Sequence, residues 1–80
     1  MLSILSQDKG TLTRYNSVAI NYGIDSKWGI ETKDFILGQY ETRERCEEIV
    51  QEVANAIYNT IINEGGIPYQ ISRVYKMPKE

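Results

Sequence analysis

Two arginines stand at the start of a predicted helix, where a cation is locally unfavourable. Thr42 is the expected N-cap of this helix, and Arg43 and Arg45 fall in its first turn. Free backbone N–H groups and the helix dipole make that end of a helix favourable for anions. Thr42, Arg43 and Arg45 can therefore gather donors around a phosphate or a carboxylate. The alternative is local ion pairing, because Glu41 with Arg45 and Arg43 with Glu47 are each four residues apart.

Aromatic residues next to basic residues form a second candidate group. The chain has eight aromatic residues, six of them tyrosines. Rings beside cations suit nucleotides, because a base presents a flat π-face and a phosphate presents charge. The same residue types are enriched where subunits meet, so a subunit interface is the alternative. Tyr22 and Phe35 occupy the same alternating positions as the apolar residues of their predicted strands, so both are expected in the core. The aromatic candidates are Tyr15, Trp28, Tyr69 and Tyr75, and the nearby cations are Arg14, Lys27, Arg73 and Lys76.

The composition argues against a conventional enzyme. The chain has no histidine and one cysteine, Cys46, so it lacks the Ser-His and Cys-His nucleophile pairs and the usual zinc ligand sets. We expect no cofactor, and Cys46 is expected as a small buried hydrophobe. The net charge of −2 and the pI near 5.1 argue against binding to polymeric nucleic acid or to an anionic membrane.

The size of the chain predicts one domain, 1–80, that associates with itself. Eighty residues bury only about 60–65% of the surface of the unfolded chain, and one cysteine cannot form an internal disulfide. We therefore expect a homo-oligomer, a dimer or a tetramer. No stretch approaches the roughly 20 apolar residues of a membrane span, and the first residues are too polar for a signal peptide. A cytoplasmic location without membrane contact is expected.

The elements that must position these residues are short strands followed by one long helix. Apolar residues alternate through 1–40 and are broken by turn residues, which predicts an antiparallel β-meander of about five strands. From residue 42 the period changes to 3.6 and predicts one amphipathic helix over 42–64, ended by Gly65 and Gly66. The segment 67–80 is expected as a short C-terminal strand or tail, which completes the sheet edge or reaches a neighbouring subunit. The fold class is therefore α+β, with the helix packed on the sheet.

The two faces of the predicted helix differ in character. One face carries acidic residues and is expected to be solvated. The other is an apolar stripe that must cover the sheet. The acidic residues are Glu44, Glu47, Glu48 and Glu52, and the apolar stripe is Cys46, Ile49, Val50, Val53, Ile57 and Ile61.

Three segments of the chain resemble a group of small proteins from phages and prophages of Gram-positive bacteria, most of them hypothetical. The segments are 4–9 (ILSQDK), 36–45 (ILGQYETRER) and 74–78 (VYKMP), and the usual form of the group is ISQDK…ILGxYxTEER…YxMP. This chain has Arg43 where the group usually has glutamate, and Cys46 where alanine is common. The first change adds positive charge at the helix start, so an anion site there is expected to be particular to this chain.

The resemblance to phage proteins of this size implies a sponge of the class that captures the cyclic nucleotide messengers of bacterial immunity systems such as CBASS. The first hypothesis is therefore a non-catalytic, oligomeric immune-evasion protein that sequesters a cyclic dinucleotide or a related small nucleotide in the host cytoplasm. The alternative is an oligomeric protein-interaction module or an inhibitor of a host protein. The residues expected to bind ligand are Thr42, Arg43, Arg45, Tyr15, Trp28, Tyr75, Arg73 and Lys76.

Overall fold

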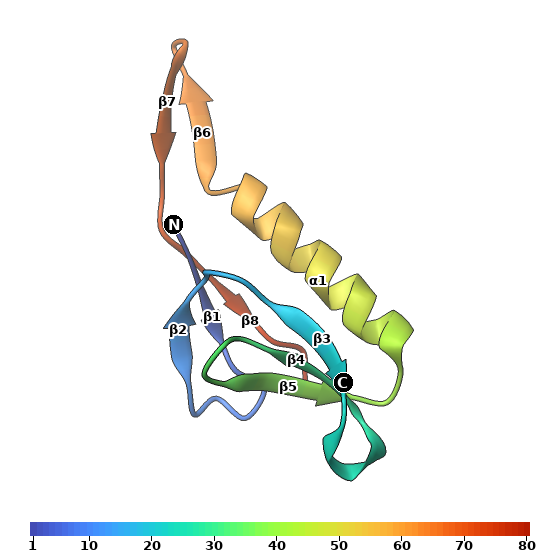
Figure 1. The fold of residues 1–80 in the computed structure, drawn as a ribbon. Coiled ribbons are helices and arrows are strands. Elements are labelled where there is room, and N and C mark those ends of the chain that lie inside the picture. The colour runs from blue at the N-terminus through green and yellow to red at the C-terminus, as the bar shows by residue number, and fades with distance from the viewer.

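The chain folds as an α+β protein with one long helix (Figure 1). The structure is a computed structural model that describes the backbone of residues 1–80 and all side chains except those of Ile24, Asn63 and Glu64. The first five strands are β1 (Leu2–Leu5), β2 (Leu12–Arg14), β3 (Ala19–Tyr22), β4 (Trp28–Glu31) and β5 (Ile36–Tyr40), with a 3₁₀ turn at Ile24–Ser26. They are followed by α1 (Arg43–Tyr58), β6 (Ile61–Glu64), β7 (Ile67–Gln70) and β8 (Arg73–Lys76).

Five strands lie within residues 1–40, as the sequence predicts, but they belong to two sheets. One sheet has the order β2-β1-β8 and the other has the order β3-β4-β5, with antiparallel neighbours in the latter. The expected meander is thus divided between β2 and β3, where Tyr15 closes the first sheet by donating its backbone N–H to the carbonyl of Leu2 at 2.8 Å. The segment that follows carries the chain to the second sheet.

The segment 67–80, expected as one strand or tail, contains two strands. Its later part, β8, completes an edge of the first sheet, which is one of the two places expected for it, whereas β7 pairs with β6. Strand β8 pairs in parallel with β1, in the register Leu2 with Arg73 through Leu5 with Lys76. The Met77 N–H continues this ladder to the Leu5 carbonyl at 3.0 Å. The first and last strands of the chain therefore lie side by side.

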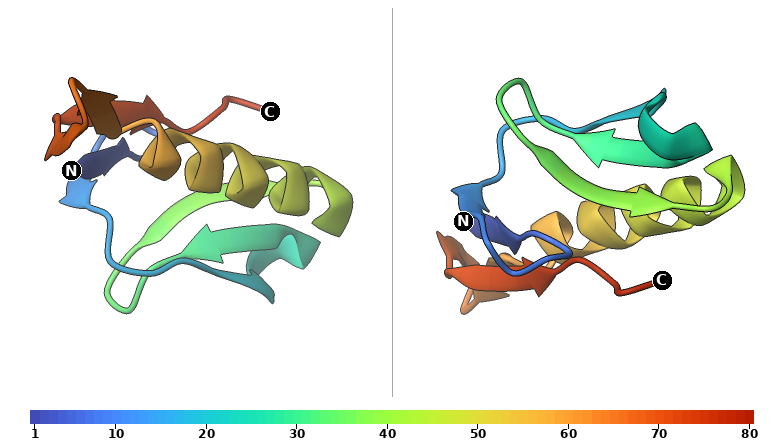
Figure 2. Two further views of the ribbon diagram at one scale, coloured as in Figure 1. Left: turned by 90° about the horizontal axis from the view of Figure 1, so that it is seen from above. Right: turned by 90° about the horizontal axis from the view of Figure 1, so that it is seen from below.

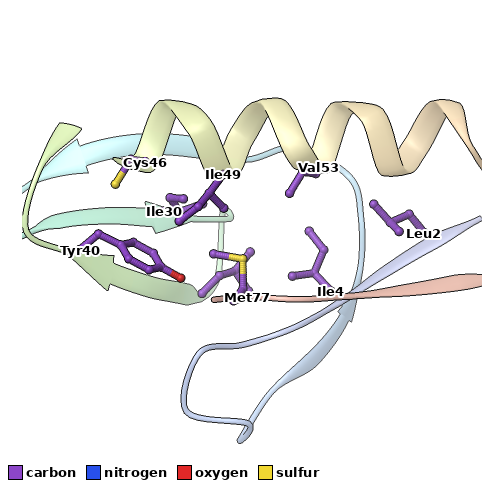
Figure 3. Packing of buried hydrophobic residues seen from close by; sticks show 9 residues of the cluster. Leu2, Ile4, Ile30, Tyr40, Cys46, Ile49, Val53 and Met77 are labelled. Carbon is purple, nitrogen blue, oxygen red and sulfur yellow. The ribbon is translucent and has the colours of Figure 1, made fainter. Parts of the chain in front are cut away.

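The core lies between α1 and both three-stranded sheets (Figures 2 and 3). The predicted stripe of the helix is confirmed at Cys46, Ile49 and Val53, which are buried, whereas Val50 and Ile57 are partly buried. Side chains from β1, β4 and β5, and Met77 after β8, close the core from the other side. The buried apolar residues are Leu2, Ile4, Ile30, Leu37, Tyr40, Cys46, Ile49, Val53 and Met77.

The predicted extent of the helix, 42–64, is wrong at its C-terminal end. The helix ends at Tyr58, and Thr60 donates its hydroxyl to the Ile57 carbonyl at 2.7 Å. The β-branched run from Thr60 to Ile62 favours extended backbone and begins β6. Gly65 and Gly66, with φ of 61° and 78°, form the turn of the β6–β7 hairpin. Two glycines with positive φ suit a hairpin turn as well as a helix end, so the glycine pair does not by itself distinguish these two elements.

Two aromatic residues expected in the core are exposed. Tyr22 is 60% exposed and Phe35 is 46% exposed. Tyr22 is the last residue of β3, and Phe35 lies in the turn before β5, which the Thr32 N–H closes by donating to the Phe35 carbonyl at 2.8 Å. Both stand at strand ends, where alternation no longer decides which face is buried.

None of the described helices has the length and apolar character that a membrane span requires.

Candidate functional site

The turn between β1 and β2 holds Gln7 in a fixed position. The Ser6 hydroxyl donates to the Asp8 carboxylate at 2.7 Å, and the Gly10 N–H donates to the same oxygen at 2.8 Å. The Thr11 N–H in turn donates to the Ser6 hydroxyl at 3.0 Å. The hydrogen bonds from Ser6 and Gly10 stabilise the charged carboxylate and lower the pKa of Asp8.

The side chain of Gln7 joins three distant parts of the chain. Its amide nitrogen donates to the carbonyls of Gln39 at 3.1 Å and Lys79 at 2.7 Å. Its amide oxygen accepts from the Gln39 N–H at 2.9 Å. One glutamine thus links the β1–β2 turn, strand β5 and the segment after β8.

Tyr40 makes a second link between β5 and the C-terminal segment. Its hydroxyl donates to the Pro78 carbonyl at 2.7 Å, and burial raises the pKa of the phenol to about 12. Its ring lies over Gly38, where an added Cβ would approach the Tyr40 hydroxyl oxygen to 2.7 Å. Glycine is therefore required at 38 for this ring to reach Pro78.

Thr42 caps α1 as predicted. The N–H of Arg45 donates to the Thr42 hydroxyl at 3.1 Å. The predicted pair of Arg43 with Glu47 is confirmed at 3.1 Å, but Glu41 pairs with Lys27 at 3.6 Å instead of with Arg45.

Arg45 is held by partners from α1 and from the end of the chain. Its guanidinium lies 3.5 Å from Glu48 and 3.8 Å from Glu52, and its Nε donates to the Glu80 carbonyl at 3.0 Å. Glu52 also accepts a hydrogen bond from the Tyr75 hydroxyl at 2.7 Å, which ties α1 to β8. Burial and this hydrogen bond raise the pKa of Tyr75. The acidic face of α1 is therefore more than a solvated surface, because Glu47, Glu48 and Glu52 hold cations and a hydroxyl.

A polar pocket of about 550 Å³ opens at the start of α1. Three cations from separate segments, Lys27, Arg45 and Lys79, line it together with the carboxylates of Glu41 and Glu80. Its volume lies in the range of small-molecule sites. We call it the α1 pocket, and its lining residues are Gln7, Lys27, Gln39, Tyr40, Glu41, Thr42, Arg45, Lys79 and Glu80.

An aromatic group lies next to the α1 pocket. The Arg43 guanidinium stands over the Trp28 ring, 5.4 Å from its centroid, and the Tyr22 ring is 5.0 Å from the same indole. Tyr22 also lines a smaller hollow of about 210 Å³, which shares Lys27 and Gln39 with the α1 pocket. This hollow and the α1 pocket are thus adjacent and meet at Lys27 and Gln39.

The structure brings some of the predicted site residues together and separates others. Thr42 and Arg45 line the α1 pocket, and Arg43 with Trp28 stands beside it. Tyr75 reaches the pocket indirectly, through Glu52 and Arg45. The other three lie elsewhere: Tyr15 packs against the core, Arg73 lines a groove near the β6–β7 hairpin, and Lys76 is exposed on β8.

Several residues of the pocket are absent from the sequence-based ligand set. Gln7, Gln39 and Lys79 line the pocket. Lys27 lines it too, although the sequence predicts Lys27 only as a cation near an aromatic residue. The signal that points to Gln7 and Gln39 is their place in the segments 4–9 and 36–45 that carry the resemblance. Those segments and the one around Tyr75 to Pro78 meet at this pocket, although they lie far apart in the sequence.

Two further facts describe the chemistry available among the described residues. Among them, no group of three histidine, cysteine, aspartate or glutamate side chains is placed to hold a metal ion. Cys46 is fully buried, and burial raises the pKa of its thiol, which disfavours the reactive thiolate. The α1 pocket presents cations and hydrogen-bonding groups alongside the carboxylates of Glu41 and Glu80.

Comparisons with known proteins supply no further assignment. No protein-family model, no curated protein and no solved structure matches this chain.

Proposed function

We propose that the protein is a non-catalytic binding protein that sequesters a small anionic nucleotide, such as a cyclic dinucleotide, in the α1 pocket. The observation that carries this proposal is the convergence of Lys27, Arg45 and Lys79 on one pocket, with a second hollow beside it that Tyr22 helps to line. A nucleotide has both a charged and a flat part, and the two adjoining spaces match that division.

The cations differ in how readily they can turn to a phosphate. Lys79 makes no ion pair with the side chains that the structure describes, so its ammonium group is available. Lys27 and Arg45 are paired with carboxylates, but these pairs are partly or largely exposed to water and are individually weak. A phosphate with two or more charged contacts competes well against such pairs.

A base would lie in the neighbouring hollow, which Tyr22 lines together with Asn21, Gly29 and Gln39. The Tyr22 ring contacts the Trp28 indole, and the Arg43 guanidinium lies over the same indole. This arrangement replaces Tyr15 and Tyr75 as stacking candidates, because neither lines the hollow or the α1 pocket.

The resemblance to phage and prophage proteins suggests the setting. In that setting the protein would act in the host cytoplasm as an immune-evasion protein, a sponge that lowers the free concentration of a cyclic nucleotide signal of the CBASS type. Sequestration needs affinity and stoichiometric expression, and no reaction on the ligand.

The test is calorimetry of the purified protein against cyclic dinucleotides, cyclic mononucleotides and inorganic phosphate, at one fixed salt concentration. We expect a nucleotide to bind and phosphate alone to bind more weakly. Arg45→Ala removes one charge-assisted contact, worth about 1.5–3 kcal/mol, which is about a 10- to 150-fold loss of affinity. Lys33→Ala is the matched control, because it removes one positive charge in the β4–β5 turn, outside the α1 pocket.

The carboxylates that hold Arg45 sharpen this experiment. Glu48→Gln weakens the competing pair at 3.5 Å and is expected to tighten nucleotide binding modestly. If the wild-type protein bound no nucleotide in the panel, the interaction-module alternative would replace this proposal. If Arg45→Ala bound as tightly as wild type, the phosphate would have been placed wrongly.

A further inference from the structure

The β6–β7 hairpin projects from the body of the protein beyond the end of α1 (Figure 1). Its strands pair with each other and with no other described strand. At its base the Ile71 N–H donates to the Thr60 carbonyl at 2.8 Å. An isolated two-stranded hairpin is marginally stable in water. This element therefore lacks the packing that the two larger sheets receive from α1.

The surface of this hairpin is apolar and nearly uncharged. Ile67 is 71% exposed and Ile61 is 55% exposed, while Tyr58, at the end of α1, is 78% exposed. The segment 59–72 contains one charged residue, Glu64. Large apolar side chains that gather on a surface with little charge are typical of protein interfaces.

A groove lies at the base of the hairpin, beside the end of α1. It has a volume of about 620 Å³ and is lined by Ala56, Asn59, Ile61, Ile62 and Arg73. The molecule thus carries a projection with Ile67 near its tip and, at the base of this projection, a groove lined by three apolar residues together with Asn59 and Arg73.

The surface area of the chain indicates how large a missing contact would be. The accessible surface is 5674 Å², whereas a compact monomer of 9.2 kDa is expected to expose about 4,900 Å². The radius of gyration is 13.7 Å, compared with about 11.6 Å for a compact chain of this length. The surplus of roughly 750 Å² is close to the area that each partner buries in an interface of standard size, about 800 Å².

We propose that the hairpin and the groove at its base form a self-association surface, and that the occupant is a second copy of this chain. One two-fold axis would place the hairpin of each copy against the groove of the other and would cover both surfaces at once. Depletion of charge favours this occupant, because two identical surfaces do not repel each other and homodimer interfaces are more apolar than transient ones. This inference does not depend on the nucleotide proposal.

The test is sedimentation equilibrium of the wild-type protein and of Ile67→Asp. We expect a wild-type dimer, and a dimer dissociation constant at least about 100-fold weaker for Ile67→Asp, because two charged carboxylates would have to be desolvated where two isoleucine side chains were buried. Leu12→Asp is the matched control, since Leu12 is 63% exposed on β2, in a different sheet, and its substitution should leave the dimer intact.

Circular dichroism must show that both variants are folded, which exposed positions should permit. A wild-type protein that remained monomeric at high concentration would overturn the inference, as would an Ile67→Asp variant that dimerised normally. Equal dissociation of the Leu12→Asp variant would place the interface elsewhere and would also overturn it. Calorimetry of Ile67→Asp with the nucleotide panel separates the two proposals, because the α1 pocket contains no residue of the hairpin.

Discussion

The two ends of α1 are built on opposite principles. At its start, Gln7, Gln39, Tyr40 and Pro78, drawn from distant parts of the chain, are joined by hydrogen bonds, and charged groups line a polar pocket. At its end, the β6–β7 hairpin is local in sequence, nearly free of charge and paired with itself. At the start of α1 the polar groups of these residues are hydrogen-bonded to one another, and the pocket has a size that suits a small polar ligand. The second end leaves apolar surface to be covered, which suits another protein surface.

The largest expected effect is a difference in the free energy of unfolding between an alanine substitution in the core beneath α1 and one in the hairpin. Ile49 is fully buried, so Ile49→Ala should lower the free energy of unfolding by about 2–5 kcal/mol through lost burial and a cavity. Ile67→Ala, at a position 71% exposed, should change it by less than about 0.5 kcal/mol when measured below the dissociation constant of the proposed dimer. Urea unfolding of both variants measures the difference. Equal losses would mean that the hairpin belongs to the same packed unit as the core.

A smaller effect is expected where the Tyr40 ring lies over Gly38. The Cβ of Gly38→Ala would collide with that ring and push the hydroxyl away from Pro78, at an expected cost of about 1–3 kcal/mol. Gly23→Ala is the matched control, because nothing lies within 4 Å of a Cβ placed there. Thermal unfolding of the two variants checks the prediction. Similar melting of both would show that the contact between Gly38 and Tyr40 does not matter.

The smallest effect is a dependence of stability on alkaline pH. The folded-state pKa of Tyr40, about 12, lies above its ordinary value of 10.0, so the stability from the neutral phenol is complete below pH 10. It should be lost progressively as the pH rises from 10 toward 12. Urea unfolding between pH 9 and pH 12 measures this loss, with Tyr40→Phe as the comparison. An unchanged slope in Tyr40→Phe would show that another group causes the dependence.

The sequence predicts those parts of the structure that depend on local patterns, and it fails where distant segments or competing local signals decide. The alternation of Ile4, Ile30 and their neighbours predicts the first five strands, and Thr42 predicts the start of α1, because these signals are local. The end of α1 was missed because Ile57 and Ile61 also fit a helical spacing. The β-branched run before the two glycines was the signal for a strand.

The candidate site divides in a similar way. Thr42, Arg43 and Arg45 are neighbours in the sequence, so their position at one helix end could be predicted from local patterns. Gln7 and Lys79 are 72 residues apart and meet because β8 pairs with β1. Sequence periodicity carries no information on that pairing. It therefore cannot predict which residues line the pocket.

The parallel pairing of β1 with β8 also gives the molecule a direction of mechanical strength. A stretching force applied at Leu2 and Met77 would pull these two strands past each other and load their hydrogen bonds together, in shear. The β6–β7 hairpin would instead be pulled apart at its base, at Ile61 and Gln70, and its bonds would open one after another. The hairpin, pulled at its base, should therefore yield at a lower force than the pairing of β1 with β8, pulled at Leu2 and Met77.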